Sequence, residues 1–195
     1  MSATTVELFY AILAVAAMLV IVGLVGLRLL ALVSAGARER YDDVADAIGP
    51  YAFSLAWFVA LLATAGSLYF SEVAGFTPCT LCWYQRIAMY PLVVILAIGA
   101  ARRERAAAWY GGALAGIGAL IAAYHVALEW IPSLDSGACD ASTPCTLVWF
   151  RVFGFISLPT LALTAFLLIL TLLAVRLSAA ADHDPDQPDP ARSTP

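Results

Sequence analysis

Long apolar blocks alternate with short polar segments along the chain. Five blocks are predominantly apolar, and their ends are defined to within a few residues: 7–33, 52–71, 85–101, 109–130 and 154–175. Their lengths approach or exceed the roughly 20 residues that a helix needs to cross the hydrocarbon layer of a membrane. Because lipid offers the backbone no hydrogen-bond partner, each block must be helical. The pattern predicts an all-α membrane protein with five spans.

The composition agrees with this prediction. Of the 195 residues, 63% are hydrophobic and only 12% are charged, whereas soluble domains carry about a quarter charged residues. We expect the lipid bilayer as surroundings and no nucleic-acid partner. Four polar segments separate the blocks: 34–51, 72–84, 102–108 and 131–153. The proline- and aspartate-rich tail from Asp182 has no apolar anchor and is expected to be disordered.

The basic residues, all ten of them arginines, predict the orientation. Six lie in the first polar segment, the third polar segment or at the end of the last block: Arg38, Arg40, Arg102, Arg103, Arg105 and Arg176. With five spans these three places share one side, which the positive-inside rule assigns to the cytoplasm. We therefore expect a multi-pass plasma-membrane protein whose N-terminus and cysteine-bearing loops face outward and whose C-terminus is cytoplasmic.

A cleaved signal peptide is the alternative for block 7–33, because Val33, Ser34 and Ala35 resemble a cleavage site. Cleavage would reverse every later span. However, no basic residue precedes the apolar run, and its start carries Glu7 instead. The run is also far longer than the 7–15 residues of a signal core. The sequence favours a retained span.

The four cysteines form two pairs on the expected outer side. Cys79 and Cys82 are spaced C-x-x-C, and Cys139 and Cys145 are spaced C-x5-C. The C-x-x-C spacing suits redox cycling, because it lowers the pKa of a thiol, and its short loop makes it a poor structural bridge. Two structural disulfides, or one zinc site built from all four cysteines, remain as alternatives.

Arg86 follows Cys82 by four residues. On a helix that begins near Cys82, both side chains lie on one face about a turn apart. The guanidinium could stabilise a thiolate, or hold the oxygen of a bound electron acceptor as negative charge develops there. It could also be an ordinary anchoring arginine at the membrane surface. A membrane dithiol needs an acceptor for two electrons, and a lipid-soluble quinone is the obvious one.

His125 and Glu129 are also four residues apart, near the outer end of their block. Ionisable residues in a span usually face the protein interior and suggest function. We expect them to form a second wall of the acceptor site, where they supply a proton or a hydrogen bond. A solvated pair at the membrane interface is the alternative.

Residues 79–86, CTLCWYQR, resemble the C-x-L-C-x-x-Q-R signature of the bacterial disulfide bond formation protein B family. The resemblance continues through GGALAGIGALIAAYHVALE and PCTLVWFRVFGFISLPTLALTAFLLI, and it covers about 52–176. The second stretch looks especially like the short-loop BdbC branch. Vitamin K epoxide reductases run similar chemistry, but there the loop cysteines precede the C-x-x-C, which excludes that family.

The resemblance implies a protein-disulfide:quinone oxidoreductase that recharges a DsbA-like, thioredoxin-fold thiol oxidase. Its cofactor would be menaquinone or ubiquinone from the membrane quinone pool. Cys139 would be attacked by the reduced partner, and Cys145 would pass electrons to Cys79. Cys82 would contact the quinone, with Arg86 supporting its thiolate, and His125 and Glu129 would lie near the quinone.

The resemblance implies a four-helix transmembrane bundle, and the first span, 7–33, departs from that pattern as one extra N-terminal transmembrane helix. We assign residues 1–50 to the extra helix and a cytoplasmic linker, 51–178 to the DsbB-like domain, and 179–195 to a disordered cytoplasmic tail. The short C-x5-C spacing leaves open how far Cys145 can swing toward Cys79. The extra helix is expected to serve packing or insertion, since nothing polar lies in its middle.

Overall fold

The computed structural model describes residues 3–135, 137, 139–140 and 142–182. It is helical, with the elements α1 (Ala3–Leu30), α2 (Ala35–Ile48), η1 (Gly49–Tyr51), α3 (Ala52–Leu68), η2 (Tyr69–Val73), α4 (Thr80–Arg102), α5 (Arg105–Trp130), η3 (Pro132–Leu134) and α6 (Leu158–Asp182). Within the described ranges five helical segments are long and apolar enough to cross a membrane. The predicted all-α membrane fold with five spans is confirmed.

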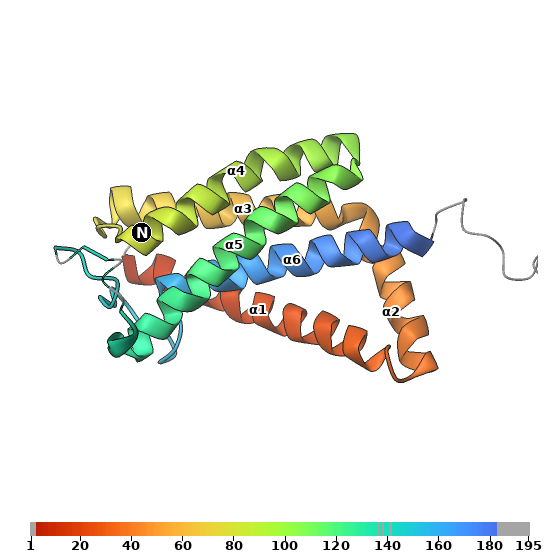
Figure 1. Cartoon of the computed structure of the whole chain (residues 1–195), viewed down its shortest axis with the longest axis horizontal. Coiled ribbons are helices and arrows are strands. Elements are labelled where there is room, and N and C mark those ends of the chain that lie inside the picture. The colour runs from red at the N-terminus through yellow and green to blue at the C-terminus, as the bar shows by residue number, and fades with distance from the viewer. Residues whose placement is uncertain (1–2, 136, 138, 141, 183–195) are drawn as a thin grey trace, which may run out of the picture.

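Helices α3, α4, α5 and α6 lie side by side as a bundle, and α1 runs along α6 (Figure 1). Small residues allow the close packing of the bundle. Its core combines alanines of α3 and α5 with large side chains of α4 and α6, among them Ala56, Ala60, Ala115, Ala119, Leu92, Leu96, Phe166 and Ile169. At Gly118 the ring of Phe166 occupies the space that a Cβ atom would need.

Two predicted boundaries differ because of local capping. Helix α4 begins at Thr80, ahead of the apolar block at 85 and close to the start expected near Cys82, since Cys79 caps it: the Cys79 sulfur accepts a hydrogen bond from the Cys82 backbone N–H at 3.3 Å. Helix α6 begins at Leu158 rather than 154, because Phe153 (φ 53°) and Gly154 (φ 80°) adopt the left-handed conformation and form a turn.

The polar segment 34–51 contains a helix, α2, that the block pattern did not predict. Tyr41 and Ala45, one turn apart, are buried against α6, and the Tyr41 hydroxyl lies 3.2 Å from the Ser178 hydroxyl. Charged residues occupy the rest of the helix surface. The predicted linker is therefore an amphipathic helix packed on the bundle.

The C-terminal boundary also differs from expectation. Residues 179–182 complete α6 instead of beginning a tail, and the remainder of the predicted tail, 183–195, lies outside the described residues. The polar turn between α4 and α5 is short: Arg103 (φ 55°) ends α4 and α5 begins at Arg105, because the alanines that follow favour helix.

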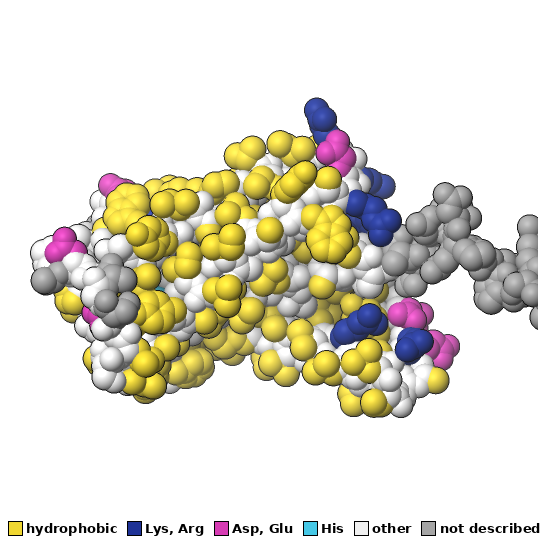
Figure 2. Space-filling model, viewed as in Figure 1, with side chains coloured by type: hydrophobic (Ala, Val, Ile, Leu, Met, Phe, Trp, Pro, Cys, Tyr) yellow, Lys and Arg dark blue, Asp and Glu magenta, His cyan; other side chains and the backbone are white. Residues whose placement is uncertain are grey.

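The two ends of the bundle differ in character. The segment 74–79, the N-terminus of α4 and the described residues between α5 and α6 gather at one end, while α2 and the α4–α5 turn lie at the other (Figure 1). On the face shown in Figure 2, arginine side chains gather at this second end, and the flank between the two ends is largely hydrophobic. The hydrophobic flank fits lipid, as expected for a membrane span.

Candidate redox-active site

The four cysteines lie together at one end of the bundle. Cys139 and Cys145 form a disulfide, whereas Cys79 and Cys82 are free thiols with their sulfurs 2.7 Å apart. All four belong to one hydrophobic cluster with Leu81 and Leu128. The short loop therefore holds the second pair directly against the first.

In each cysteine pair, one member is buried and the other is partly exposed. Cys145 is fully buried, and its disulfide partner Cys139 is partly exposed. Cys79 is buried at the helix N-terminus, and Cys82 is partly exposed. One cysteine of each pair is thus accessible, while the other lies inside the shared cluster.

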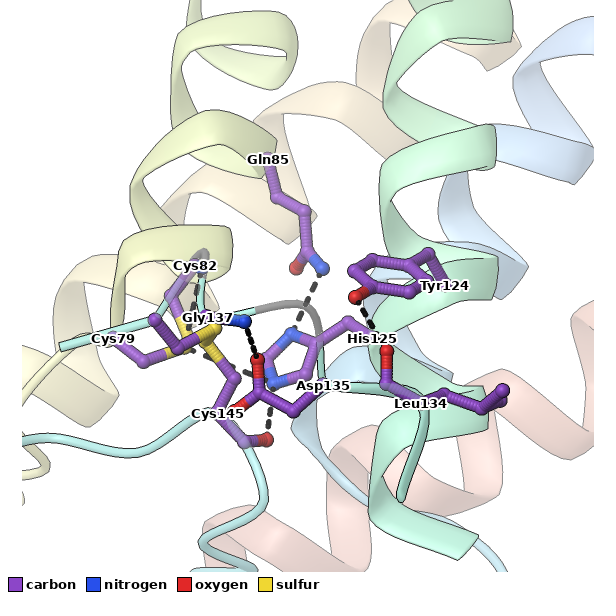
Figure 3. Close-up of a disulfide and its surroundings, with 10 residues drawn as sticks. Cys79, Cys82, Gln85, Tyr124, His125, Leu134, Asp135, Gly137 and Cys145 are labelled. Carbon is purple, nitrogen blue, oxygen red and sulfur yellow. Dashed lines mark hydrogen bonds between the residues drawn. A yellow bond between two sulfur atoms is a disulfide. The ribbon is translucent and has the colours of Figure 1, made fainter. Parts of the chain in front are cut away.

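His125 of α5 connects the two pairs (Figure 3). Its Nδ1 atom lies 3.1 Å from the side-chain amide nitrogen of Gln85, which donates, so Nδ1 accepts. The proton is then on Nε2, which lies 3.1 Å from the Cys145 carbonyl oxygen and 3.7 Å from the Cys79 sulfur. The imidazole N–H therefore faces both the backbone of one pair and the sulfur of the other.

Cys79 is the thiol that the site prepares for ionisation. The hydrogen bond from the Cys82 thiol, together with the hydrogen bonds from His125 and from the Cys82 backbone N–H, lowers the pKa of Cys79 to about 4, although burial opposes this. Hydrogen bonds to the charged form of an acid favour that form. A thiolate is the nucleophile of thiol–disulfide exchange, so Cys79 is equipped for that chemistry.

Arg86 is fixed to α3. Its Nε donates to the Ser67 hydroxyl at 2.9 Å, and its Nη2 donates to the Ser67 carbonyl at 3.0 Å. The guanidinium carbon also lies 5.1 Å from the centre of the Trp83 ring. No acceptor within the described part of the chain bonds Nη1, so this group keeps donors for a bound molecule.

A cavity of about 400 Å³ opens beside Cys82. Cys82, Gln85, Arg86 and Ser67 are among the polar side chains that line it. Most of the remaining wall is apolar and comes from α1, α3, α4 and α6. Stacked aromatic rings border it, with Phe76 and Trp149 centres 4.7 Å apart. The cavity is within the usual size of small-molecule sites, and its polarity suits a molecule with a polar head and an apolar tail.

Glu129 lies apart from this large cavity. It accepts a hydrogen bond from Ser157 and lies 3.9 Å from Arg151, and its side chain is only 2% exposed. Glu129 and His125 line a second, much smaller cavity, of about 10 Å³, with Cys79 and Cys82. Neither residue expected as a second wall of the acceptor site lines the large cavity, although His125 is hydrogen-bonded to Gln85, which does.

The described residues of this site offer few side chains that could bind a zinc ion. Cys139 and Cys145 are joined to each other, so the four-cysteine site does not form in this structure. The ligand atoms of Cys79, Cys82 and His125 lie within 4.8 Å of one another. Among the described residues, this group falls one short of the four ligands that structural zinc sites use.

Sequence reasoning assigned no role to Gln85 and Ser67. Gln85 could have been found, because it follows Cys82 by three residues and belongs to the same motif and helix face. Ser67 gives no such signal, since it meets Arg86 only through the packing of α3 on α4.

Comparison with known proteins decides the family. The family model described as "Disulfide bond formation protein DsbB" matches residues 50–176. The chain belongs to the DsbB family. This membership agrees with the resemblance of the CTLCWYQR motif, and it makes the chain a membrane protein of disulfide bond formation.

Individual relatives are similar over the same region. "Probable disulfide formation protein" of Oceanobacillus iheyensis is 45% identical over 120 residues, which are 60% of this chain and 83% of the relative. "Disulfide bond formation protein C" of Bacillus subtilis is 44% identical over 120 residues, 61% of this chain and 87% of the relative. "Probable disulfide formation protein C" of Halalkalibacterium halodurans is 46% identical over 123 residues, covering 62% and 90%. No solved structure matches the chain significantly.

Proposed function

We propose that this DsbB-family protein oxidises a reduced, thioredoxin-fold dithiol protein outside the cytoplasm and delivers the electrons to a membrane quinone. The observation that carries the proposal is the placement of two cysteine pairs in one cluster, with Cys82 on the wall of an apolar cavity. The basic residues at the opposite end support a cytoplasmic assignment for that end.

The first exchange would begin at Cys139, the accessible member of its pair. A thiolate of the reduced partner attacks the Cys139 sulfur, the bond between Cys139 and Cys145 breaks, and Cys145 leaves as a thiolate. The second thiol of the partner then attacks the mixed disulfide. The partner leaves with its own disulfide, and Cys139 is released as the second reduced cysteine of the pair. Two electrons have entered the protein.

The second exchange would pass through the shared cluster. When Cys79 and Cys82 are joined, the Cys145 thiolate attacks the Cys79 sulfur and Cys82 leaves as a thiolate. Cys139 then attacks Cys145, which restores the second disulfide and releases Cys79 as a thiolate stabilised by its hydrogen bonds. The His125 N–H, which faces both Cys79 and Cys145, orients the two sulfurs and favours charge on Cys79.

The cavity residues fit a quinone. Cys82, Gln85 and Arg86 would hold its polar head, because Arg86 is anchored on Ser67 and keeps Nη1 donors, and the apolar wall would hold its tail. A quinone bound there would supply the acceptor for the two electrons and two protons that leave when Cys79 and Cys82 are rejoined.

Trapping of the first intermediate tests the proposal. A thioredoxin-fold partner that keeps only its first active-site cysteine, in reduced form, should give a covalent complex with the unmodified protein, mapped to Cys139 by mass spectrometry. The variant Cys139→Ser should give none. If the unmodified protein forms no complex with several such partners, the disulfide between Cys139 and Cys145 is a static bridge and the proposal fails.

A further inference from the structure

Helix α1 lies outside the matched residues 50–176, yet it contributes a wall to the cavity beside Cys82. Residues at helical spacing on one of its faces line the cavity: Tyr10, Leu13, Ala14, Ala16, Ala17 and Val20. The span expected to serve only packing or insertion therefore meets the candidate acceptor site. The cavity is therefore lined by four spans, α1, α3, α4 and α6, of which α1 lies outside the matched residues.

Specific contacts seat the N-terminal half of α1. The Tyr10 hydroxyl donates to the Leu62 carbonyl at 3.1 Å. The Tyr10 ring lies over Gly66, where an added Cβ would be 2.6 Å from the ring. Ala11 and Ala14 are buried against Ile156. Because glycine and alanine allow such close approach, this half of α1 has a defined position on the bundle.

Three small side chains of α1 line the cavity. Ala14, Ala16 and Ala17 lie there between the larger Tyr10, Leu13 and Val20, whereas Leu19 (69% exposed) and Val22 (70% exposed) point away from the bundle. Alanines on this wall leave the space in which an apolar chain can lie. The polar head region at Cys82 and Arg86 is an independent feature of the same cavity.

We propose that α1 forms the tail-binding wall of the quinone site and that Ala16 and Ala17 determine whether a long apolar tail is accepted. This inference rests on the proposed function and names the part of the quinone that α1 would recognise. The tail lies between α1 and the bundle, and the head remains with the residues of α3 and α4. The extra helix is thus a specificity element for long-tailed quinones.

Cross-linking tests the position of the tail without relying on turnover. A quinone with a photoreactive azide at the end of an isoprenoid tail is bound to the purified full chain, irradiated, and mapped by mass spectrometry. We expect labelled peptides from α1 between Tyr10 and Val20, in addition to α3 or α6. Labelling of α3, α4 or α6 with none on α1 would overturn the inference while leaving the quinone site intact. Absence of competable labelling anywhere would instead count against the proposed function.

Paired substitutions test the specificity. In Ala17→Phe the ring fills the cavity, and the KM for a long-tailed quinone should rise at least tenfold, with little change for a tail-less quinone. Ala16→Leu is a milder second variant, in case Ala17→Phe does not fold. Val22→Phe places the same ring on the outer face of α1 and should leave both KM values unchanged. Equal KM values for a long-tailed quinone in folded Ala16→Leu, Ala17→Phe and Val22→Phe would show that α1 only anchors the protein.

Discussion

The Nε2 atom of His125 lies 3.7 Å from the sulfur of Cys79 and 3.1 Å from the carbonyl oxygen of Cys145. Gln85 holds the opposite ring nitrogen, so the imidazole has one orientation and presents an N–H to both cysteine pairs. This arrangement joins helix α5 to the dithiol at the start of α4. It explains why the site distinguishes Cys79 from Cys82.

The ultraviolet absorbance of thiolates in the reduced protein should reveal this distinction, because it needs no reagent to reach the buried sulfur. With a pKa of about 4, Cys79 is largely thiolate at pH 6 and should contribute thiolate absorbance there. Cys82→Ala removes the largest stabilising hydrogen bond and His125→Leu removes the next donor, so both substitutions should raise the pKa of Cys79 toward its ordinary value. Once the pKa of Cys79 exceeds 6, each further unit of increase in that pKa lowers the thiolate fraction at pH 6 about tenfold.

The denatured protein is the control for this profile, because its cysteines should titrate near the ordinary thiol pKa of about 8.5. The depressed pKa also has a consequence for stability. The Cys79 thiolate stabilises the reduced fold fully above the ordinary thiol pKa, and this contribution is lost as the pH falls toward about 4. A folded protein in which thiolate absorbance appears only near the ordinary thiol pKa would contradict the geometry.

Arg86→Lys should weaken the acceptor site without disturbing thiol exchange. A lysine cannot reproduce the paired bonds from Nε and Nη2 to Ser67, so the cation loses its fixed position. We expect the KM for a quinone analogue to rise about tenfold, or about 1.4 kcal/mol, comparable to one charge-assisted hydrogen bond. Arg103→Lys, in the exposed turn at the opposite end, is the matched control. Equal KM values in the two variants would remove Arg86 from the site.

The pair of Glu129 and Arg151 should matter for stability. Arg151→Leu leaves the buried Glu129 carboxylate without its counter-charge, which should lower the free energy of unfolding by about 1 to 3 kcal/mol. Adding Glu129→Gln to Arg151→Leu removes the uncompensated charge and should recover part of the loss. Thermal unfolding in detergent measures both. No difference between Arg151→Leu and the unmodified protein would show that the pair is not coupled.

Gly118→Ala should destabilise the bundle core. The new methyl group would collide with the ring of Phe166, which is fully buried and cannot move away freely. Overpacking of this kind costs about 1 to 3 kcal/mol. Gly116→Ala, two residues earlier on the same helix, meets nothing within 4 Å and is the control. The melting temperature should fall for Gly118→Ala only; an equal fall for both would indicate a backbone effect.

The five spans could be predicted from sequence because lipid forces apolar, helical segments of a minimum length. The amphipathic helix α2 could not be found in that way, since its burial depends on two residues, Tyr41 and Ala45, within a charged segment. Helix ends were missed where caps or left-handed residues decide them, as at Cys79 and Phe153.

The sequence predicted which residue types carry the chemistry of the candidate site, but not the contacts that these side chains make with other helices. The C-x-x-C spacing pointed to Cys79 and Cys82, and helical spacing near the outer ends of the spans pointed to Arg86 and His125. Helical spacing did not show that Arg86 would bond Ser67, because that contact joins two helices. Likewise, α1 lies against the cavity because of its packing on other helices, and the spacing of residues within α1 does not reveal that packing.

Quinone reduction by the purified protein tests the central claim most directly. The protein is given a fully reduced thioredoxin-fold dithiol protein and a menaquinone analogue, and the absorbance of the quinone is followed. Our account predicts turnover in the unmodified protein and none in Cys82→Ser or Cys139→Ser, because each substitution interrupts one of the two exchanges. Absence of turnover with several partners and quinones, together with stoichiometric bound zinc, would contradict the account and make the cysteines structural.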